Sequence, residues 1–194
     1  MYEDKIMQLI FIRHGKTEGN LRKAYIGVTD EPLCERGIAE LDRTYPKADI
    51  VITSGMLRCR MTADIIYKNV PHYELSGLNE CNFGKFEGKN HSDLDGNEYY
   101  QKWIDSMGEL PFPDGESMAE FKKRSVSEFR KIMFWLENEN VNTAAFVVHG
   151  GTIMSILSEL GDEGKSYYDY ITDNGEGFVC KWEDGKCRNI MRLC

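Results

Sequence analysis

Arg13 and His14 stand side by side at the end of a short apolar segment, and Gly15 follows them directly. A guanidinium can hold an anion through paired hydrogen bonds, and an imidazole can act as a nucleophile or carry a proton. The glycine lets the backbone come close to a bound group. Together these residue types favour chemistry on a phosphate group.

Two further reactive side chains follow other apolar segments of the chain. Arg58 comes shortly after residues 49–53, and His149 closes residues 143–149. The carboxyl ends of parallel strands meet at one edge of a sheet, and ligands bind at this edge. If these segments are parallel strands, Arg58 and His149 lie beside His14, and the three side chains form one anion site.

The elements that must position these residues alternate along the chain. Short apolar segments predict strands, and amphipathic segments between and after them predict helices. The predicted strands are residues 7–13, 49–53 and 143–149, and the predicted helices are residues 37–41, 57–67, 93–107 and 117–138, with another helix after Gly151. Residues 177–193 predict a β-hairpin that turns at Asp184-Gly185. The pattern predicts the α/β class, as a three-layer α/β/α sandwich with a mostly parallel central sheet.

Residues 78–115 differ in composition from the rest of the chain, because they are rich in Gly, Asn, Asp and aromatic residues. We interpret them as a small cap inserted into a single domain of residues 1–194. The aromatic side chains between Phe83 and Phe112 could stack on an aromatic ring of a ligand. Packing of the cap onto the domain is the favoured interpretation.

The overall charge limits the partners that the chain can have. Its formal net charge is −8 at 194 residues. Nucleic acids and anionic membranes are held by basic surfaces, so neither is an expected partner. An anionic substrate must therefore be held by a local group of cations, and we expect the partner to be a small phosphomonoester. A homodimer is compatible with the sequence.

Six cysteines lie at positions 34, 59, 81, 180, 187 and 194, without a close pair or a histidine at metal-ligand spacing. This scatter disfavours a zinc site, and we predict neither a metal nor another cofactor. The start of the chain lacks the features of a secretory signal, and the apolar stretches are too short to span a bilayer. We therefore expect reduced thiols and a cytoplasmic location.

The sequence Gly15-Lys16-Thr17 imitates the end of a phosphate-binding P-loop. That motif also needs a glycine five residues before Gly15, where this chain has Ile10. Ile10 belongs inside the first predicted strand, so no P-loop can form there. Nucleotide hydrolysis of the P-loop type is therefore not expected.

Several blocks of the sequence resemble the histidine phosphatase superfamily, also called phosphoglycerate mutase-like. The matching blocks are residues 13–20, 54–63, 78–88 and 149–151, and residues 113–117 resemble the segment before the family's long helix. The resemblance covers about residues 7–157. It implies the fold of that family and a phosphatase or mutase activity.

The resemblance also implies roles for single residues. His14 would be the nucleophile that accepts the phosphoryl group, and Glu80 would be the proton donor to the leaving oxygen. Glu80 would then activate the water that hydrolyses phospho-His14. The groups that contact the phosphate would be Arg13, Arg58 and His149, with Asn20, Thr17 and the Gly150 backbone as further contacts.

The chain most resembles the alpha-ribazole phosphatase branch of this family. It is shorter than the cofactor-dependent mutases after the Glu80 block, where it reads Cys81-Asn82-Phe83, and this favours a phosphatase over a mutase. The expected activity is removal of the 5′-phosphate of alpha-ribazole phosphate in cobalamin biosynthesis. The alternatives are a broad-specificity sugar phosphatase, a phosphoglycerate mutase, a fructose-2,6-bisphosphatase-like enzyme, or a non-catalytic relative that only binds a phospho-ligand.

Overall fold

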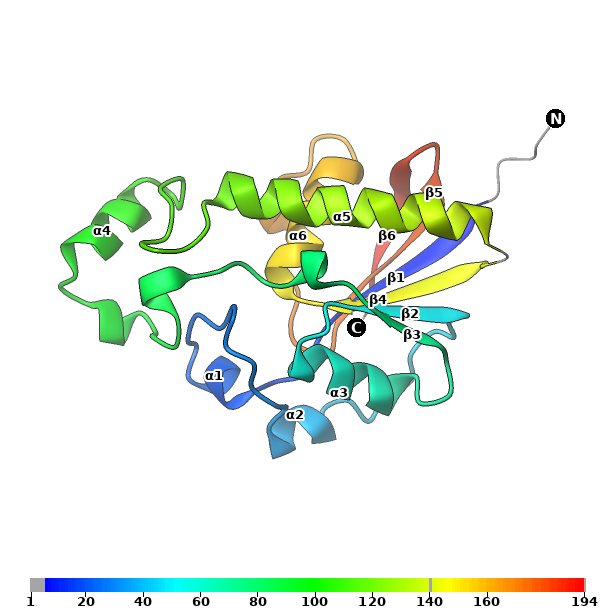
Figure 1. The fold of residues 1–194 in the computed structure, drawn as a ribbon, viewed down its shortest axis with the longest axis horizontal. Coiled ribbons are helices and arrows are strands. Elements are labelled where there is room, and N and C mark those ends of the chain that lie inside the picture. Colours follow the sequence, from blue (N-terminus) through cyan, green and yellow to red (C-terminus); the bar gives the residue numbers. More distant parts are fainter. Residues whose placement is uncertain (1–5, 140, 194) are drawn as a thin grey trace.

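A six-stranded sheet forms the centre of the computed structural model, which describes residues 6–139 and 141–193 (Figure 1). The strands are β1 (Met7–Arg13), β2 (Ile50–Thr53), β3 (His72–Glu74), β4 (Thr143–Val148), β5 (Gly177–Glu183) and β6 (Lys186–Leu193). Their order is β3-β2-β4-β1-β5-β6. Strands β3, β2, β4 and β1 run parallel, and β5 and β6 add an antiparallel hairpin at the edge. The predicted α/β class and mostly parallel sheet are confirmed.

Helices cover both faces of this sheet. The α-helices are α1 (Glu18–Leu21), α2 (Glu35–Ala39), α3 (Leu57–Ile66), α4 (Glu98–Asp105), α5 (Met118–Asn138) and α6 (Gly150–Leu160). Four 3-10 helices in the described chain are η1 (Ser76–Leu78), η2 (Gly84–Phe86), η3 (Ser92–Leu94) and η4 (Tyr167–Tyr170). Figure 1 shows α5 and α6 on one face of the sheet and α3 on the other.

Alternate residues of β1 bury their side chains on opposite faces, as expected for a strand between two helical layers. Phe11 packs against Phe129 of α5, with ring centroids 5.7 Å apart. Ile10 and Ile12 belong to a second buried cluster that contains Ala63 of α3. The sandwich therefore has two cores, one on each side of the sheet.

Helix α5 begins where the sequence predicts it. Ser117 is the N-cap, and its hydroxyl accepts a hydrogen bond from the backbone N–H of Glu120 while the Glu120 carboxylate accepts one from the backbone N–H of Ser117. This reciprocal capping box satisfies two N–H groups that would otherwise lack a partner. The predicted start of the long helix is confirmed.

The predicted helix over residues 93–107 is wrong in its first part. The segment forms η3 and then α4, and Gly96 between them has φ +74°. The Asn97 side chain accepts hydrogen bonds from the N–H groups of Tyr99 and Tyr100, so it caps α4. The left-handed glycine and the new cap break the helix that periodicity alone predicts.

Aromatic side chains from residues 83–112 form the centre of a third buried cluster. Phe86, Tyr100 and Phe112 are almost fully buried, and they pack with Phe121 near the start of α5. The rings of Tyr100 and Trp103 stack with centroids 6.1 Å apart. These side chains pack residues 83–112 together and against α5, as the packing interpretation of their composition predicts.

The described cysteines are free thiols and all are buried: Cys34, Cys59, Cys81, Cys180 and Cys187. Cys194 lies outside the described residues, as do residues 1–5, on which part of the expectation about a secretory signal rests. Among the described helices, none combines the length and the apolar character that crossing a bilayer requires.

Candidate active site

His14 follows β1 directly and is almost fully buried. Its Nδ1 lies 2.7 Å from the carbonyl oxygen of Gly15. A carbonyl can only accept, so Nδ1 carries the proton and donates it, and Nε2 keeps its lone pair. Burial, together with the charges of Arg58 and Arg13, lowers the pKa of His14 well below its usual value. The imidazole is therefore neutral near pH 7 and chemically suited to act as a nucleophile.

Two guanidinium groups flank this imidazole. Arg58 of α3 is fully buried, and it donates to the carbonyl oxygens of Gly27 and Thr29 at 2.8 Å each. Arg13 of β1 donates to the carbonyl oxygen of Thr172 at 2.8 Å. Within the described residues, the Nε atom of each arginine is buried and has no hydrogen-bond partner. Both arginines thus have an unused buried donor, and the charges of both act on His14.

His149 lies at the end of β4 and is the N-cap residue of α6. Its ring meets that of His14 edge-on, with centroids 5.2 Å apart. Its Nε2 lies 2.8 Å from the hydroxyl of Ser54 and 3.6 Å from the thiol of Cys59. Burial and the charge of Arg58 lower the pKa of His149 well below its usual value.

The carboxylate of Glu80 comes from the loop after η1 and lies at the carboxyl ends of the parallel strands, where it contacts the start of α6. It accepts hydrogen bonds of 3.0 Å from the backbone N–H groups of Cys81 and Gly151. Burial raises the pKa of Glu80, although these N–H groups and the charges of Arg58 and Arg13 oppose the shift. The raised pKa favours the protonated acid, which can donate to a leaving oxygen.

Gly151 leaves room for the Glu80 carboxylate where it meets α6. A Cβ at Gly151 would lie 2.4 Å from Oε1 of Glu80, which is closer than side chains tolerate. Gly150, the first residue of α6, lies beside Arg13, because a Cβ there would lie 3.4 Å from Nε of that arginine. The backbone of α6 therefore contacts both the carboxylate and a guanidinium of the site.

The other two residues predicted to contact substrate lie at the start of α1. Asn20 is half-buried, and its Oδ1 accepts from the backbone N–H of Thr17 and from Nδ2 of Asn174, each at 3.2 Å. Thr17 is fully buried, and its hydroxyl caps α1 by accepting from the N–H of Asn20. Thr17 thus has a structural task in the described fold, and its contact with substrate stays a prediction.

Sequence reasoning missed several residues that support this site. Asn174 also donates a hydrogen bond to the carbonyl oxygen of His14 at 2.9 Å. The hydroxyl of Thr62 accepts a hydrogen bond from the backbone N–H of Gly15 at 2.9 Å. Ser54 lies in a block that resembles the family, so its position beside His149 could have been found. Asn174 lies in a loop far along the sequence, and no pattern points to it.

The loop that Arg58 holds is fixed from a second side by Glu87. Its Oε1 accepts from the N–H groups of Gly27 and Thr29, at 2.7 and 2.9 Å. Arg58 binds carbonyl groups of the same two residues. Both arginine and loop are therefore held in place, which lowers the cost of organising the site around an anion.

The site gathers chemical groups that complement one another. The charges of Arg13 and Arg58 act on both the His14 imidazole and the Glu80 carboxyl group. Within residues 6–139 and 141–193, no group of three or more His, Cys, Asp or Glu side chains could hold a metal ion. The arrangement can hold a phosphate, attack its phosphorus and protonate a leaving oxygen.

Comparison with known proteins agrees with this geometry. The sequence profile of the histidine phosphatase superfamily (branch 1) matches residues 9–192. The chain belongs to the histidine phosphatase superfamily, and it is an enzyme of the phosphatase type.

Three relatives illustrate the range of activities within this similarity. A broad-specificity phosphatase of Saccharomyces cerevisiae is 30% identical, over 89% of this chain and 78% of its own. A 2,3-bisphosphoglycerate-dependent phosphoglycerate mutase of Gloeobacter violaceus is 35% identical, over 78% of this chain and 74% of its own. The crystal structure of the alpha-ribazole phosphatase of Shigella flexneri superposes with a TM-score of 0.76 at 26% identity, covering 93% of each chain.

Proposed function

We propose that this protein is a phosphomonoesterase that needs no metal and works through a phosphohistidine at His14. Nε2 of His14 attacks the phosphorus, and the bond from phosphorus to the ester oxygen breaks. Glu80 gives its proton to that oxygen, so the product leaves as a neutral alcohol. The Glu80 carboxylate then takes a proton from water while the water oxygen attacks phospho-His14. Inorganic phosphate is released, and both side chains return to their starting states.

The state of His14 is the observation that carries this proposal. Its Nδ1 proton is committed to the carbonyl of Gly15, and burial and positive charge keep the ring neutral. A buried neutral imidazole with a free lone pair beside two guanidinium groups suits attack on a dianion better than a structural role.

Arg13 and Arg58 supply the positive charge that this reaction requires. The transition state of phosphoryl transfer spreads negative charge over its equatorial oxygens. Fixed guanidinium groups stabilise that charge without rearranging during the reaction. This charge distribution supports a mechanism in which no metal takes part.

As the substrate we propose alpha-ribazole 5′-phosphate. The likeness to the alpha-ribazole phosphatase of Shigella flexneri over 93% of both chains supports this choice. The short loop after Glu80 supports a phosphatase. A second candidate is a broad-specificity phosphatase, because the yeast relative covers 89% of this chain.

A panel of phosphomonoesters tests this function. We would measure release of inorganic phosphate from alpha-ribazole 5′-phosphate, 3-phosphoglycerate and fructose 2,6-bisphosphate in excess chelator, with His14→Ala as the negative control. We expect kcat/KM for alpha-ribazole 5′-phosphate to exceed the others by at least about tenfold.

Other outcomes would point elsewhere. Loss of activity in chelator would contradict the metal-independent mechanism. Equal kcat/KM values across the panel would identify a broad-specificity phosphatase. Isomerisation of 3-phosphoglycerate without phosphate release would identify a mutase.

A further inference from the structure

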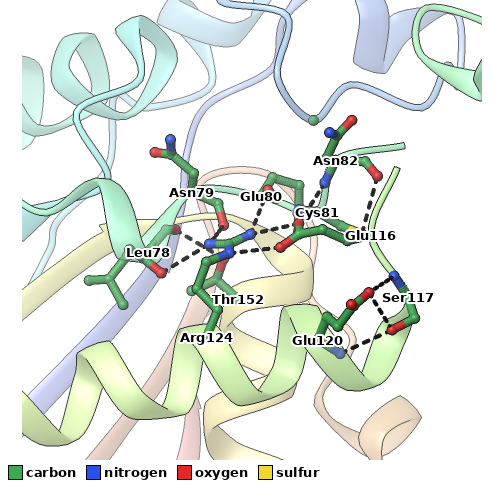
Figure 2. Close-up of polar contacts among 12 residues, drawn as sticks. Leu78, Asn79, Glu80, Cys81, Asn82, Glu116, Ser117, Glu120, Arg124 and Thr152 are labelled. Atoms are coloured by element: carbon green, nitrogen blue, oxygen red, sulfur yellow. Dashed lines mark hydrogen bonds and ion pairs between the residues drawn. The ribbon is translucent and has the colours of Figure 1, made fainter. Parts of the chain in front are cut away.

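The segment that carries Glu80 lies outside the sheet, so its backbone needs other partners. Arg124 of α5 supplies them (Figure 2). Its NH1 donates to the carbonyl oxygens of Gly77 and Asn79 at 3.0 Å each, and its NH2 donates to that of Glu80 at 3.3 Å. One side chain thus binds three carbonyl groups, one inside η1, one directly after it and one at Glu80 itself.

Glu116 fixes the orientation of Arg124 and binds the same segment further along. Its two carboxylate oxygens accept from Nε and NH2 of Arg124 at 2.9 and 2.8 Å, in the paired geometry that guanidinium groups favour. Glu116 also accepts from the N–H of Asn82 at 2.9 Å, and its own N–H donates to the Asn82 carbonyl at 2.9 Å. The backbone on either side of Glu80 is therefore anchored to one ion pair.

The ion pair is partly shielded from solvent. The side chains of Arg124 and Glu116 are 30% and 23% exposed. The paired hydrogen bonds raise the pKa of Arg124. Burial alone would raise the pKa of Glu116, but Arg124 and the N–H of Asn82 bring it below its usual value. Both shifts favour the charged forms of the ion pair.

The other end of Glu80 is held by α6. Its carboxylate accepts the N–H of Gly151, and the hydroxyl of Thr152 donates to the carbonyl of Leu78 at 3.2 Å. The backbone of Glu80 thus rests on α5 and its carboxylate rests on α6. A shift of the backbone by a fraction of an ångström would move the acid relative to His14.

We propose that Arg124, held by Glu116, is a positioning residue that sets the place of Glu80 for protonation of the leaving oxygen. Arg124 does not touch the substrate, and it acts through the backbone of residues 77–82. This inference rests on the proposed function, because it takes Glu80 as the proton donor.

The dependence of rate on the leaving group separates positioning of an acid from a general loss of structure. An alkoxide leaves only with a proton, whereas p-nitrophenolate leaves without one. The constant kcat/KM reports steps up to the departure of that group, so a slow second step does not disturb it. A displaced Glu80 must therefore lower kcat/KM for an alkyl phosphate and spare that for p-nitrophenyl phosphate.

The experiment compares Arg124→Lys and Glu116→Gln with wild type on both substrates. We expect each variant to lose about 10- to 100-fold in kcat/KM on the alkyl phosphate, and less than about threefold on p-nitrophenyl phosphate. Arg130→Lys is the matched control, because Arg130 is an exposed arginine on the same helix. It should leave both constants at the wild-type value. Thermal unfolding of every variant verifies that the fold is retained.

Glu80→Gln is measured on the same two substrates. It tests whether Glu80 is the proton donor, separately from whether Arg124 positions it. Suppose that Glu80→Gln selectively loses kcat/KM on the alkyl phosphate but Arg124→Lys and Glu116→Gln do not. This inference is then overturned and the proposed function stands. A parallel loss on both substrates in Arg124→Lys and Glu116→Gln would also overturn it, since a merely structural role predicts that. If Glu80→Gln itself shows no selectivity, the proton donor is wrong and the inference fails with it.

Discussion

Arg58 and Arg124 both fix a loop by donating to its carbonyl oxygens, but their charges are compensated differently. Arg124 has a carboxylate partner in Glu116 at 2.8 Å. No carboxylate of the described chain forms an ion pair with Arg58, which is fully buried and retains an unpaired Nε–H. A buried charge of this kind is costly unless an anion binds beside it.

The difference divides the site into two halves. In the proposed mechanism, the phosphate half, at the ends of β1 and β4 and the start of α3, keeps its positive charge available for the phosphoryl group. The leaving-group half, residues 77–82 with the start of α5, is in this proposal a charge-compensated scaffold that places one acid. Substitutions in the first half should affect every substrate, and substitutions in the second should affect those that need a proton.

The largest effect is expected in the phosphate half. Arg58→Met removes a fixed charge from the transition state and should lower kcat/KM by about 10³-fold for alkyl and p-nitrophenyl phosphates alike. Arg60→Met is the control, because Arg60 is exposed on the same helix and should keep wild-type rates. Steady-state kinetics measure both constants, and thermal unfolding verifies that the fold is retained. A loss confined to alkyl phosphates would contradict the assignment of Arg58 to the phosphate half.

The pH profile sharpens the assignment of the acid. Glu80 has a raised pKa, so its proton is present at low pH and lost as pH rises through that value. His14 has a lowered pKa, so it becomes neutral at lower pH than usual. We expect kcat/KM for an alkyl phosphate to fall as pH rises, and Glu80→Gln to lower the maximum by about 10²-fold and remove this fall. Because both enzymes use one substrate, ionisation of that substrate cancels. An unchanged fall in Glu80→Gln would assign the titration to another group.

Gly151 lies where the two halves meet, and replacing it should have an intermediate effect. An alanine Cβ would come within 2.4 Å of the Glu80 carboxylate and 2.9 Å of Phe121, so Glu80 must move. We expect a loss of about tenfold or more in kcat/KM on alkyl phosphates. Gly150→Ala should cost less, because its Cβ would meet Arg13 at an ordinary 3.4 Å. Equal effects of the two variants would contradict the close approach at Gly151.

The smallest effect is expected where the scaffold begins. Ser117→Ala removes the capping box of α5, and we expect the free energy of unfolding to fall by about 1 kcal/mol. The kcat/KM ratio of alkyl to p-nitrophenyl phosphate should stay at its wild-type value. Ser127→Ala, at an exposed position inside the same helix, controls for loss of a hydroxyl. Denaturant unfolding measures both, and a changed ratio in Ser117→Ala would mean that the cap itself positions Glu80.

The phosphate half is also the part that the sequence predicts best. His14, Arg58 and His149 each follow an apolar strand, and the rule that parallel strands end at one edge brings them together. The start of α5 can be predicted because its capping box joins residues only three positions apart in the sequence. The hairpin of β5 and β6 is readable from its turn and alternation.

The leaving-group half is harder to predict from the sequence because its contacts are long-range. Arg124 donates to carbonyl groups that lie 44 to 47 residues away in sequence. Every residue has a backbone carbonyl, so the sequence does not indicate which ones an arginine binds. Asn174 binds His14 across 160 residues. Strand β3 is three residues long and mostly polar, so no periodicity predicts it. The role of Glu80 follows from family resemblance, since an acid in a loop carries no signal of its own.

Rapid-quench trapping of the phosphoenzyme tests whether His14 is the nucleophile. The enzyme would be mixed with a radiolabelled phosphomonoester, quenched within its first turnover, and mapped by digestion. We predict acid-labile phosphate on His14 at up to one per chain, none in His14→Ala, and longer-lived label in Glu80→Gln, which lacks the base for hydrolysis. Turnover without covalent phosphate, or label on another residue such as His149, would mean that the reaction does not pass through phospho-His14.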